Sequence, residues 1–257
     1  TPTYIDAQFD PTAEFRLNGD PGTAGYVLTS NGIGIAPVWQ AKPISINGST
    51  LYSSGLTGTG NTSGNNIFLG TNAGSGATST YNGNFFGLNA GQNATGSWGA
   101  NFLGENAGYG ATAAYLSNFL GRFAGQGATA ARVSNFIGYG SGYLSTNAQQ
   151  ANFLGWSAGG EAPNASFSNF MGRESGFSAD NANGSNFFGP YSGRYADNAS
   201  NANFMGDHAG HGSTNASLAN FFGYYAGSGA TNATNSIFIG QSAGSGDSVN
   251  NTGNTDD

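Results

Sequence analysis

The main pattern of this chain is a 17-residue block of apolar and polar positions that recurs without insertion or deletion. Every seventeenth position counted from Gly70 is again a Gly, eleven in all, up to Gly240. A Phe lies two residues before each of these Gly, and a large apolar residue always separates the two. The Phe column is Phe68, Phe85, Phe102, Phe119, Phe136, Phe153, Phe170, Phe187, Phe204, Phe221 and Phe238. Such a strict period indicates a stack of structurally equivalent units.

The rest of the unit is small and polar. Asn precedes the Phe in nine repeats, Asn84 to Asn220, whereas the first and last repeats have Ile67 and Ile237. A second Gly follows four residues after the first, and a segment resembling Ala-Thr-Asn-Ala comes next. We number the positions of the unit from Asn84 and its equivalents, so Phe is at position 2 and the two Gly are at positions 4 and 8.

The unit predicts an all-β fold, a parallel β-solenoid or β-roll of eleven 17-residue coils. It is too short for two packed helices, and Gly and Asn disfavour helices. Short strands are expected at Asn-Phe-apolar and near Ala-Thr-Asn-Ala, with the Gly at the corners. Coils about 4.8 Å apart would form a rod about 48 Å long. We expect the Phe column to form one internal stack and the Asn column an amide ladder.

The two adjacent apolar columns at positions 2 and 3 predict how copies of the chain assemble. Successive strand residues point to opposite faces, so only one of these columns can fill the inside of a regular coil. The other would face outward along eleven rungs, and an apolar stripe of that length is not left in water. We therefore expect other copies of the chain to cover it. A sharp bend at this point would instead turn both columns inward.

The repeat also resembles known units. Asn-Phe-Phe-Gly-x-x-Ala-Gly, at residues 84–91 and 220–227, is similar to the Asn-Thr-Phe-Ile-Gly-x-x-Ala-Gly repeats of phage tail fibres and related bacterial surface proteins. It is more distantly similar to the head repeats of trimeric autotransporter adhesins, which are trimers of β-rolls with a shorter unit. The resemblance covers residues 65–247. It implies a homotrimer, a place outside the cell or on a virion surface, and a rod that binds a cell-surface glycan or protein receptor.

Residues 1–46 contain no 17-residue unit, and we interpret them as an attachment or connector segment. Part of this segment, Gly22 to Gln40, resembles a connector of phage fibre proteins. Its pattern predicts a strand at Tyr26 to Thr29, an Asn31-Gly32 turn and a strand at Ile33 to Trp39. Such a hairpin is too small to fold alone, so we expect it to intertwine with other chains.

The remaining boundaries follow from composition. Residues 47–64 are rich in Gly, Ser, Thr and Asn and are expected to be a linker. The solenoid is predicted over 65–247, and 248–257 form a polar tail that we expect to fray. The first residue, Thr1, is not Met, so we expect the chain to be processed or to be part of a longer product.

Composition excludes several classes of protein. The chain has only 6 Lys and Arg against 13 Asp and Glu, a net charge of −7, which disfavours a nucleic-acid partner. Its 257 residues include no Cys, so no disulfide or thiolate metal site is available. No apolar run approaches the roughly 18 residues that a membrane span needs, so we expect no membrane insertion. An apolar share of 37% with regularly placed Phe argues against disorder despite 45 Gly.

Groups with catalytic or metal-binding potential are few. The only two His, His208 and His211, share one coil, so no Ser-His-Asp arrangement is expected. With Asp207 they could form part of a metal site, but a solvated loop is the preferred interpretation, without metal or cofactor. Asp180 and Asp197 are separated by one period, so they lie on adjacent rungs. Paired carboxylates could do acid–base work or hold Ca²⁺, yet no cleft accompanies them in the sequence, and we predict that the protein is not an enzyme.

Position 12 is mostly Thr, which could indicate an ice-binding ladder. Pro163, Asp180 and Asp197 interrupt this column, and Thr suits strands in any case. We therefore take the Thr column as structural.

Positions 5, 6 and 9 tolerate any chemistry and are expected to face solvent or a partner. Aromatic residues gather there after residue 138, and the candidates for ligand binding are Tyr139, Trp156, Tyr191, Tyr224 and Tyr225. The variable columns also contain Phe123 at position 6 and Tyr109, Tyr143 and Phe177 at position 9, among charged and polar residues. The alternative is that these rings are ordinary surface or subunit-contact residues.

Three functions remain open from the sequence. The first is a fibre or adhesin rod of a phage tail or cell surface that presents a receptor-binding face. The second is a subunit that assembles head to tail into an extracellular filament, because a solenoid without blocked ends continues to stack. The third, a solenoid enzyme acting on polysaccharide, would need a cleft with paired carboxylates. We expect the first.

Overall fold

A computed structural model describes residues 66–248 and the short segments 26–29, 38–41, 44–46 and 49–51 of the chain. The described residues form fifteen strands and none of them is helical. Contacts divide the chain into two units, Thr1–Tyr52 and Ser53–Asp257, and the second contains the repeats. Over the part of the chain that is described, no helix has the length and apolar character of a membrane span.

The first unit contains two short antiparallel pairs. Strand β1 (Tyr26–Thr29) pairs with β2 (Val38–Ala41), and β3 (Ile44–Ile46) pairs with β4 (Ser49–Leu51). The predicted first strand is confirmed, and Val38 and Trp39 of the predicted second strand lie in β2, which continues to Ala41. Residues 33–37 of that prediction lie outside the described residues. The expected Asn31-Gly32 turn lies outside the described residues, and β4 lies within the range expected to be linker.

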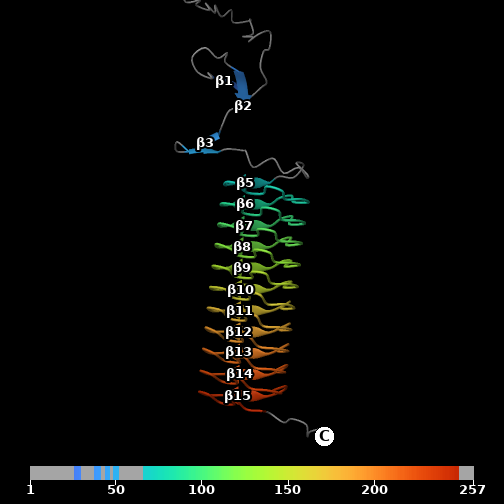
Figure 1. The fold of residues 1–257 in the computed structure, drawn as a ribbon, viewed down its shortest axis with the longest axis vertical. Helices are drawn as coiled ribbons and strands as arrows, with labels where there is room; N and C mark the ends of the chain where they lie inside the picture. Colours follow the sequence, from blue (N-terminus) through green and yellow to red (C-terminus); the bar gives the residue numbers. More distant parts are fainter. Residues whose placement is uncertain (1–25, 30–37, 42–43, 47–48, 52–65, 249–257) are drawn as a thin grey trace, which may run out of the picture. The chain divides into compact units, whose positions relative to one another are not determined.

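The repeats form a single parallel sheet of eleven three-residue strands stacked in chain order (Figure 1). Neighbouring strands pair in register, so that each Phe lies opposite the Phe of the next coil. The strands are β5 (Ile67–Leu69), β6 (Asn84–Phe86), β7 (Asn101–Leu103), β8 (Asn118–Leu120), β9 (Asn135–Ile137), β10 (Asn152–Leu154), β11 (Asn169–Met171), β12 (Asn186–Phe188), β13 (Asn203–Met205), β14 (Asn220–Phe222) and β15 (Ile237–Ile239). The predicted parallel β-solenoid is therefore confirmed. We number its coils 1 to 11 from the strand that opens each.

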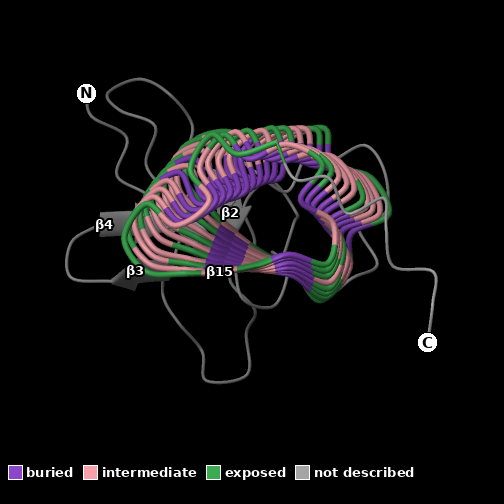
Figure 2. Ribbon diagram, turned by 90° about the horizontal axis from the view of Figure 1, so that it is seen from below, coloured by how far each residue is buried: buried purple, intermediate pink, exposed green. Residues whose placement is uncertain are grey.

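The Phe column forms the expected internal stack. Successive rings are 4.6 to 4.9 Å apart between centroids and 3° to 20° from parallel. The nine rings from Phe85 to Phe221 are fully buried, and only the end rings Phe68 and Phe238 are partly exposed. Ala residues at positions 7, 11 and 14 fill much of the remaining interior. Seen along the stack, buried residues line the inside of every coil (Figure 2).

The two Gly of the unit have separate steric causes. At position 8, Gly125 has φ +61°, and a Cβ there would lie 2.2 Å from the ring of Phe119 in the same coil. At position 4, Gly121 has φ +131°, and a Cβ would lie 2.5 Å from the carbonyl oxygen of Gly138 in the next coil. The Gly at position 8 therefore makes room for the Phe ring, and the Gly at position 4 allows successive backbones to approach closely.

The second predicted strand is reduced to single bridges. Position 12 pairs in parallel from rung to rung, for example Thr112 with Thr129, without extending into a strand. Left-handed residues flank it, such as Leu144 (φ 52°) and Asn147 (φ 50°) in coil 5. Because left-handed residues turn the chain, extended backbone cannot continue past position 12 on either side.

Asn side chains form amide ladders up the stack. From Asn84 to Asn220, each Nδ2 donates to the Oδ1 of the next Asn at position 1 over 2.7 to 2.9 Å. This ladder was expected. A second ladder at position 13, from Asn147 to Asn232, has longer bonds of 3.1 to 3.3 Å. Both hold neighbouring coils in register.

Candidate binding surfaces

The outer face of the parallel sheet is an exposed apolar stripe. At position 3, Leu103 is 36% exposed, Ile137 40% and Met171 38%, whereas the Phe on the other side of each strand is buried. Coils 2 to 5 form a shallow groove of about 510 Å³ on this face, lined by positions 1 and 3: Asn84, Phe86, Asn101, Leu103, Asn118, Leu120, Asn135 and Ile137. The two columns thus point to opposite sides, as a regular strand requires, and position 3 is the outward one.

The variable positions form a second surface, the aromatic edge, which we define as positions 5, 6 and 9 of coils 4 to 10. Tyr139 stacks on Trp156 at 6.1 Å, and the guanidinium of Arg173 lies 5.0 Å from the Trp156 ring and 5.4 Å from that of Tyr191. His208 then lies between Tyr191 and Tyr225, at 4.7 and 4.5 Å.

Tyr224 completes this strip by packing edge-on against Tyr225 at 4.5 Å. All five predicted ligand-binding residues therefore belong to one continuous strip, which Arg173 and His208 complete. Within this strip Tyr191, His208 and Tyr225 cover one another's faces. Exposed ring surface remains at Tyr139, Trp156 and Tyr224.

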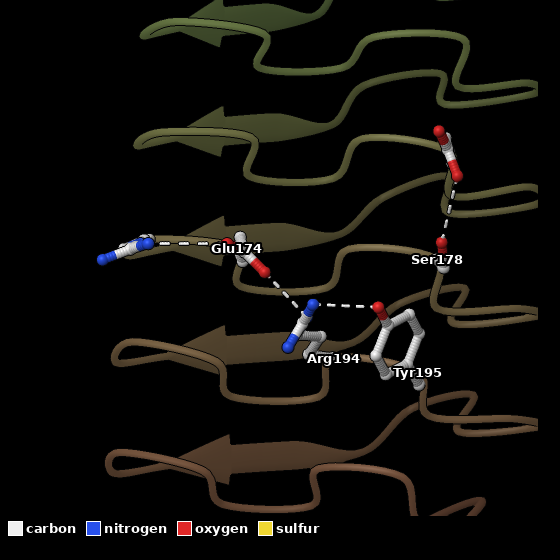
Figure 3. A network of polar contacts seen from close by, with 6 residues as sticks. Glu174, Ser178, Arg194 and Tyr195 are labelled. Carbon is white, nitrogen blue, oxygen red and sulfur yellow. Dashed lines mark hydrogen bonds and ion pairs between the residues drawn. The ribbon is translucent and has the colours of Figure 1, made fainter.

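A buried carboxylate organises the charges of the edge. Glu174 is only 8% exposed, and its two carboxylate oxygens lie 2.7 Å from Arg194 Nε and 3.8 Å from Arg173 Nε. Arg194 also donates from Nη2 to the hydroxyl of Tyr195 at 2.9 Å (Figure 3). Glu174 thus holds two cations of coils 7 and 8 against the aromatic rings. A second pair, Arg122 with Glu105 at 3.1 Å, is well exposed.

The two His lie on this edge. The Asp207 carboxylate contacts His208 Nδ1, and the His211 ring lies 5.3 Å from that of His208. Burial lowers the pKa of His211, and the nearby His208 and Arg194 lower it further. Desolvation raises the pKa of the Tyr225 hydroxyl, with smaller contributions from Tyr224 and Asp207. Across the described part of the chain, His, Asp and Glu side chains do not gather into a group of three that could hold a metal ion.

An aromatic hollow of about 340 Å³ opens on the edge between coils 4 and 7. Its lining residues are Phe123, Gln126, Tyr139, Gly140, Tyr143, Ser157 and Phe177. Of the five predicted ligand-binding residues, only Tyr139 lines it. The signal that marks the hollow in the sequence is the run of small residues, Gly140 and Ser157 at position 6 and Gly160 at position 9, among bulky neighbours.

Asp180 and Asp197 form a backbone bridge on adjacent rungs, as their spacing predicted. They are half-buried at position 12, and neither lines the groove or the hollow described above.

No protein-family model matches this chain, and no curated protein matches it. The functional argument therefore depends on the geometry of the stack and its outer surfaces.

Proposed function

We propose that this protein is a structural rod, a fibre or adhesin element that joins with other copies of itself along the sheet face and presents its aromatic edge to a receptor. The observation that carries the proposal is the contrast between two exposed surfaces. Position 3 is apolar in every coil although it faces outward, whereas positions 5, 6 and 9 vary freely. The core does not require an apolar residue at an outward position, so a partner that contacts every rung is the physical reason for it.

The sheet face suits burial against a second copy. Three residues across and eleven rungs along give on the order of 500 Å² per copy, so two faces together reach about 1,000 Å², the lower limit for specific interfaces. The Asn ladder beside the apolar column already satisfies one donor and one acceptor of most amides, which lowers the penalty of excluding water.

We propose a parallel trimer. Parallel copies keep identical rungs level, so each rung would contribute one layer of three side chains at position 3 around the common axis. The resemblance of the repeat to trimeric fibre and adhesin proteins supports this order of assembly. It also supports a place outside the cell or on a virion surface, with a cell-surface glycan or protein as the receptor.

We propose binding and support for this chain, and not catalysis. Among the described residues, the carboxylates at equivalent positions of adjacent rungs are Asp180 and Asp197, and neither lines the groove or the hollow. A polysaccharide-cleaving solenoid would need such a pair inside a cleft.

Sedimentation tests the assembly. The parent should sediment as an oligomer, and a trimer has three times the mass of one 25.9 kDa chain. The double variant Leu120→Asp, Leu154→Asp places charges on the sheet face and should sediment as a monomer. The matched control is Thr129→Asp, Thr146→Asp, because position 12 already accepts Asp at Asp180 and Asp197. A parent that sediments as a stable 25.9 kDa monomer overturns the proposal.

A second candidate, the head-to-tail filament, is favoured by the two end coils. Among the described residues, β5 pairs only with β6 and β15 only with β14. Both end coils replace Asn by Ile at position 1, and Ile67 and Ile237 are 56% and 65% exposed. Coil 11 of one copy stacked on coil 1 of the next would place Ile against Ile and Phe against Phe. Negative-stain microscopy separates the candidates, since a fibre rod forms short discrete particles and a filament has open length.

A further inference from the structure

We propose that the aromatic hollow between coils 4 and 7 binds one neutral sugar ring. The inference depends on the proposed function in that it identifies the part of the aromatic edge that meets a receptor and the chemistry that it accepts.

Small residues create the hollow. Position 6 is Phe123 in coil 4 and Glu174 in coil 7, but between them it is only Gly140 and Ser157. At position 9 the ring of Phe177 lies over Gly160 of the previous coil, where a Cβ would approach the ring to 3.1 Å. The missing side chains leave space over two rungs, and the hollow is therefore a permanent feature of the backbone stack.

Aromatic rings form the walls. Phe123 packs edge-on against Tyr139, with centroids 5.5 Å apart and an angle of 86°, so the two rings meet as a corner. Tyr143 and Phe177 contribute further ring surface at position 9. Sugar rings have faces of C–H groups, and aromatic rings supply the flat apolar contact that such faces need.

Gln126, which lines the hollow, has a hydrogen-bond acceptor without a partner. Its Oε1 is buried, and no donor among the described residues reaches it. A buried acceptor without a partner is unfavourable, so a ligand hydroxyl toward which the Gln126 amide turns would relieve that cost. Ser157 and the Tyr side chains that line the hollow offer hydroxyl groups nearby. The arrangement of apolar walls with a few polar groups is typical of small-molecule sites.

The lining contains no Asp, Glu, Lys or Arg, which favours a neutral ligand. The guanidinium of Arg122 lies 4.5 Å from the centroid of the Phe123 ring, and it is already paired with Glu105 at 3.1 Å. A volume of about 340 Å³ is near the small end of ligand sites, so the hollow suits one ring and not a long chain. The ligand is therefore a hexose-like ring, either free or at the end of a surface glycan.

Binding is tested with the full chain on an array of immobilised neutral mono- and oligosaccharides, followed by titration of the strongest sugar. Trp156 stacks on Tyr139, so its fluorescence should change as the sugar binds. Two variants alter the hollow. Tyr139→Ala removes a wall, and Ser157→Tyr fills the floor with a residue that position 6 already accepts at Tyr191 and Tyr225 with similar left-handed φ angles of 57° and 58°. Each should weaken binding by about tenfold or more.

Two control variants, one Tyr→Ala and one Gln→Leu, make the same kind of substitution outside the hollow. Tyr81→Ala truncates a Tyr that is 41% exposed at position 15 of coil 1, outside the aromatic edge, and should bind like the parent. Gln126→Leu should weaken binding by removing the buried acceptor, whereas Gln92→Leu, at the same position 9 of coil 2, should not.

A parent that binds no neutral sugar overturns the inference, and so does equal binding by parent, Tyr139→Ala and Ser157→Tyr. Binding of a protein or peptide alone through the hollow also overturns it. None of these results affects the sedimentation test of the rod, so failure of the sugar site and failure of the proposed function are distinguishable.

Discussion

At the scale of single residues, the core of each coil is the Phe ring at position 2, which occupies the space left by the Gly at position 8. Each Phe at position 2 lies against the Gly at position 8 of its own coil and between the Phe rings of the neighbouring coils. The ring is too large for any side chain to share that space, which explains why both residues recur in all eleven coils.

Removing one central ring should destabilise the stack. Phe153→Ala should lower the free energy of unfolding by about 3 to 5 kcal/mol, because the cavity is bounded by rings above and below. Phe167→Ala is the control, since Phe167 is 61% exposed at position 16, and its effect should be within about 0.5 kcal/mol. Urea denaturation monitored by circular dichroism measures both. Equal effects would contradict the internal stack.

The second Gly allows steric overlap to be separated from backbone strain. Gly159→Ala adds a methyl group 2.2 Å from the Phe153 ring at φ +61°, whereas Gly110→Ala adds one at φ +64° with nothing within 4 Å. Gly110→Ala should destabilise by about 1 kcal/mol from the left-handed backbone alone. Gly159→Ala should lose about 1 to 3 kcal/mol more from overpacking. If the two variants have the same melting temperature, the Phe ring does not occupy the space that the structure assigns to it.

At the scale of elements, three-residue strands depend on pairing with their neighbours, and every strand between β5 and β15 is paired on both sides. The amide ladder at position 1 joins the coils from Asn84 to Asn220, and bridges at position 12 join all neighbouring coils except the pair at Pro163 and Asp180. On the aromatic edge, ion pairs and ring contacts join neighbouring coils, and Glu174 is the buried charged residue among them.

The variant Glu174→Gln tests the ion pairs of Glu174 with Arg173 and Arg194. The variant leaves Arg173 and Arg194 without their carboxylate, and stability should fall by about 1 to 3 kcal/mol. Glu105→Gln removes the exposed partner of Arg122 and should change stability by less than about 1 kcal/mol. Thermal unfolding at low and high salt measures both variants. The loss of stability in Glu105→Gln should also become smaller at high salt, because salt screens an exposed ion pair. A larger effect for Glu105→Gln would show that burial does not strengthen the Glu174 network.

At the scale of the whole molecule, each coil contacts its neighbours, and among the described residues the strands β5 and β15 at the two ends of the stack pair on one side only. The face and the ends are separate routes to assembly. Along the face, copies join side by side, and at the ends they extend the sheet.

A charge at one end tests the second route. Ile237→Asp should shorten or abolish filaments, because it places a carboxylate where Ile237 would meet Ile67 of the next copy. Ser228→Asp, on a side position one coil earlier, is the control and should leave filament length unchanged. Negative-stain microscopy measures the distribution of filament lengths for the two variants. Filaments of equal length in both would rule out end-to-end stacking through β15.

The sequence by itself determined the period, the coil and the inside of the coil. It did so because a stack repeats one local environment, so a residue that must fit that environment appears at every step, as Phe153, Gly159 and the Asn of position 1 do. The prediction that position 3 faces outward also followed, since a strand alternates its faces.

Only the tertiary structure decided how the variable residues meet. The expected second strand became a single bridge because left-handed residues turn the chain on both sides of position 12. Tyr191 and Tyr225, predicted to bind ligand, stack on His208, whereas Tyr139 lines the hollow together with Phe123, Tyr143 and Phe177. The physical reason is that an aromatic side chain is available only where its neighbours on the rungs above and below are small, and that depends on three-dimensional packing and not on the repeat.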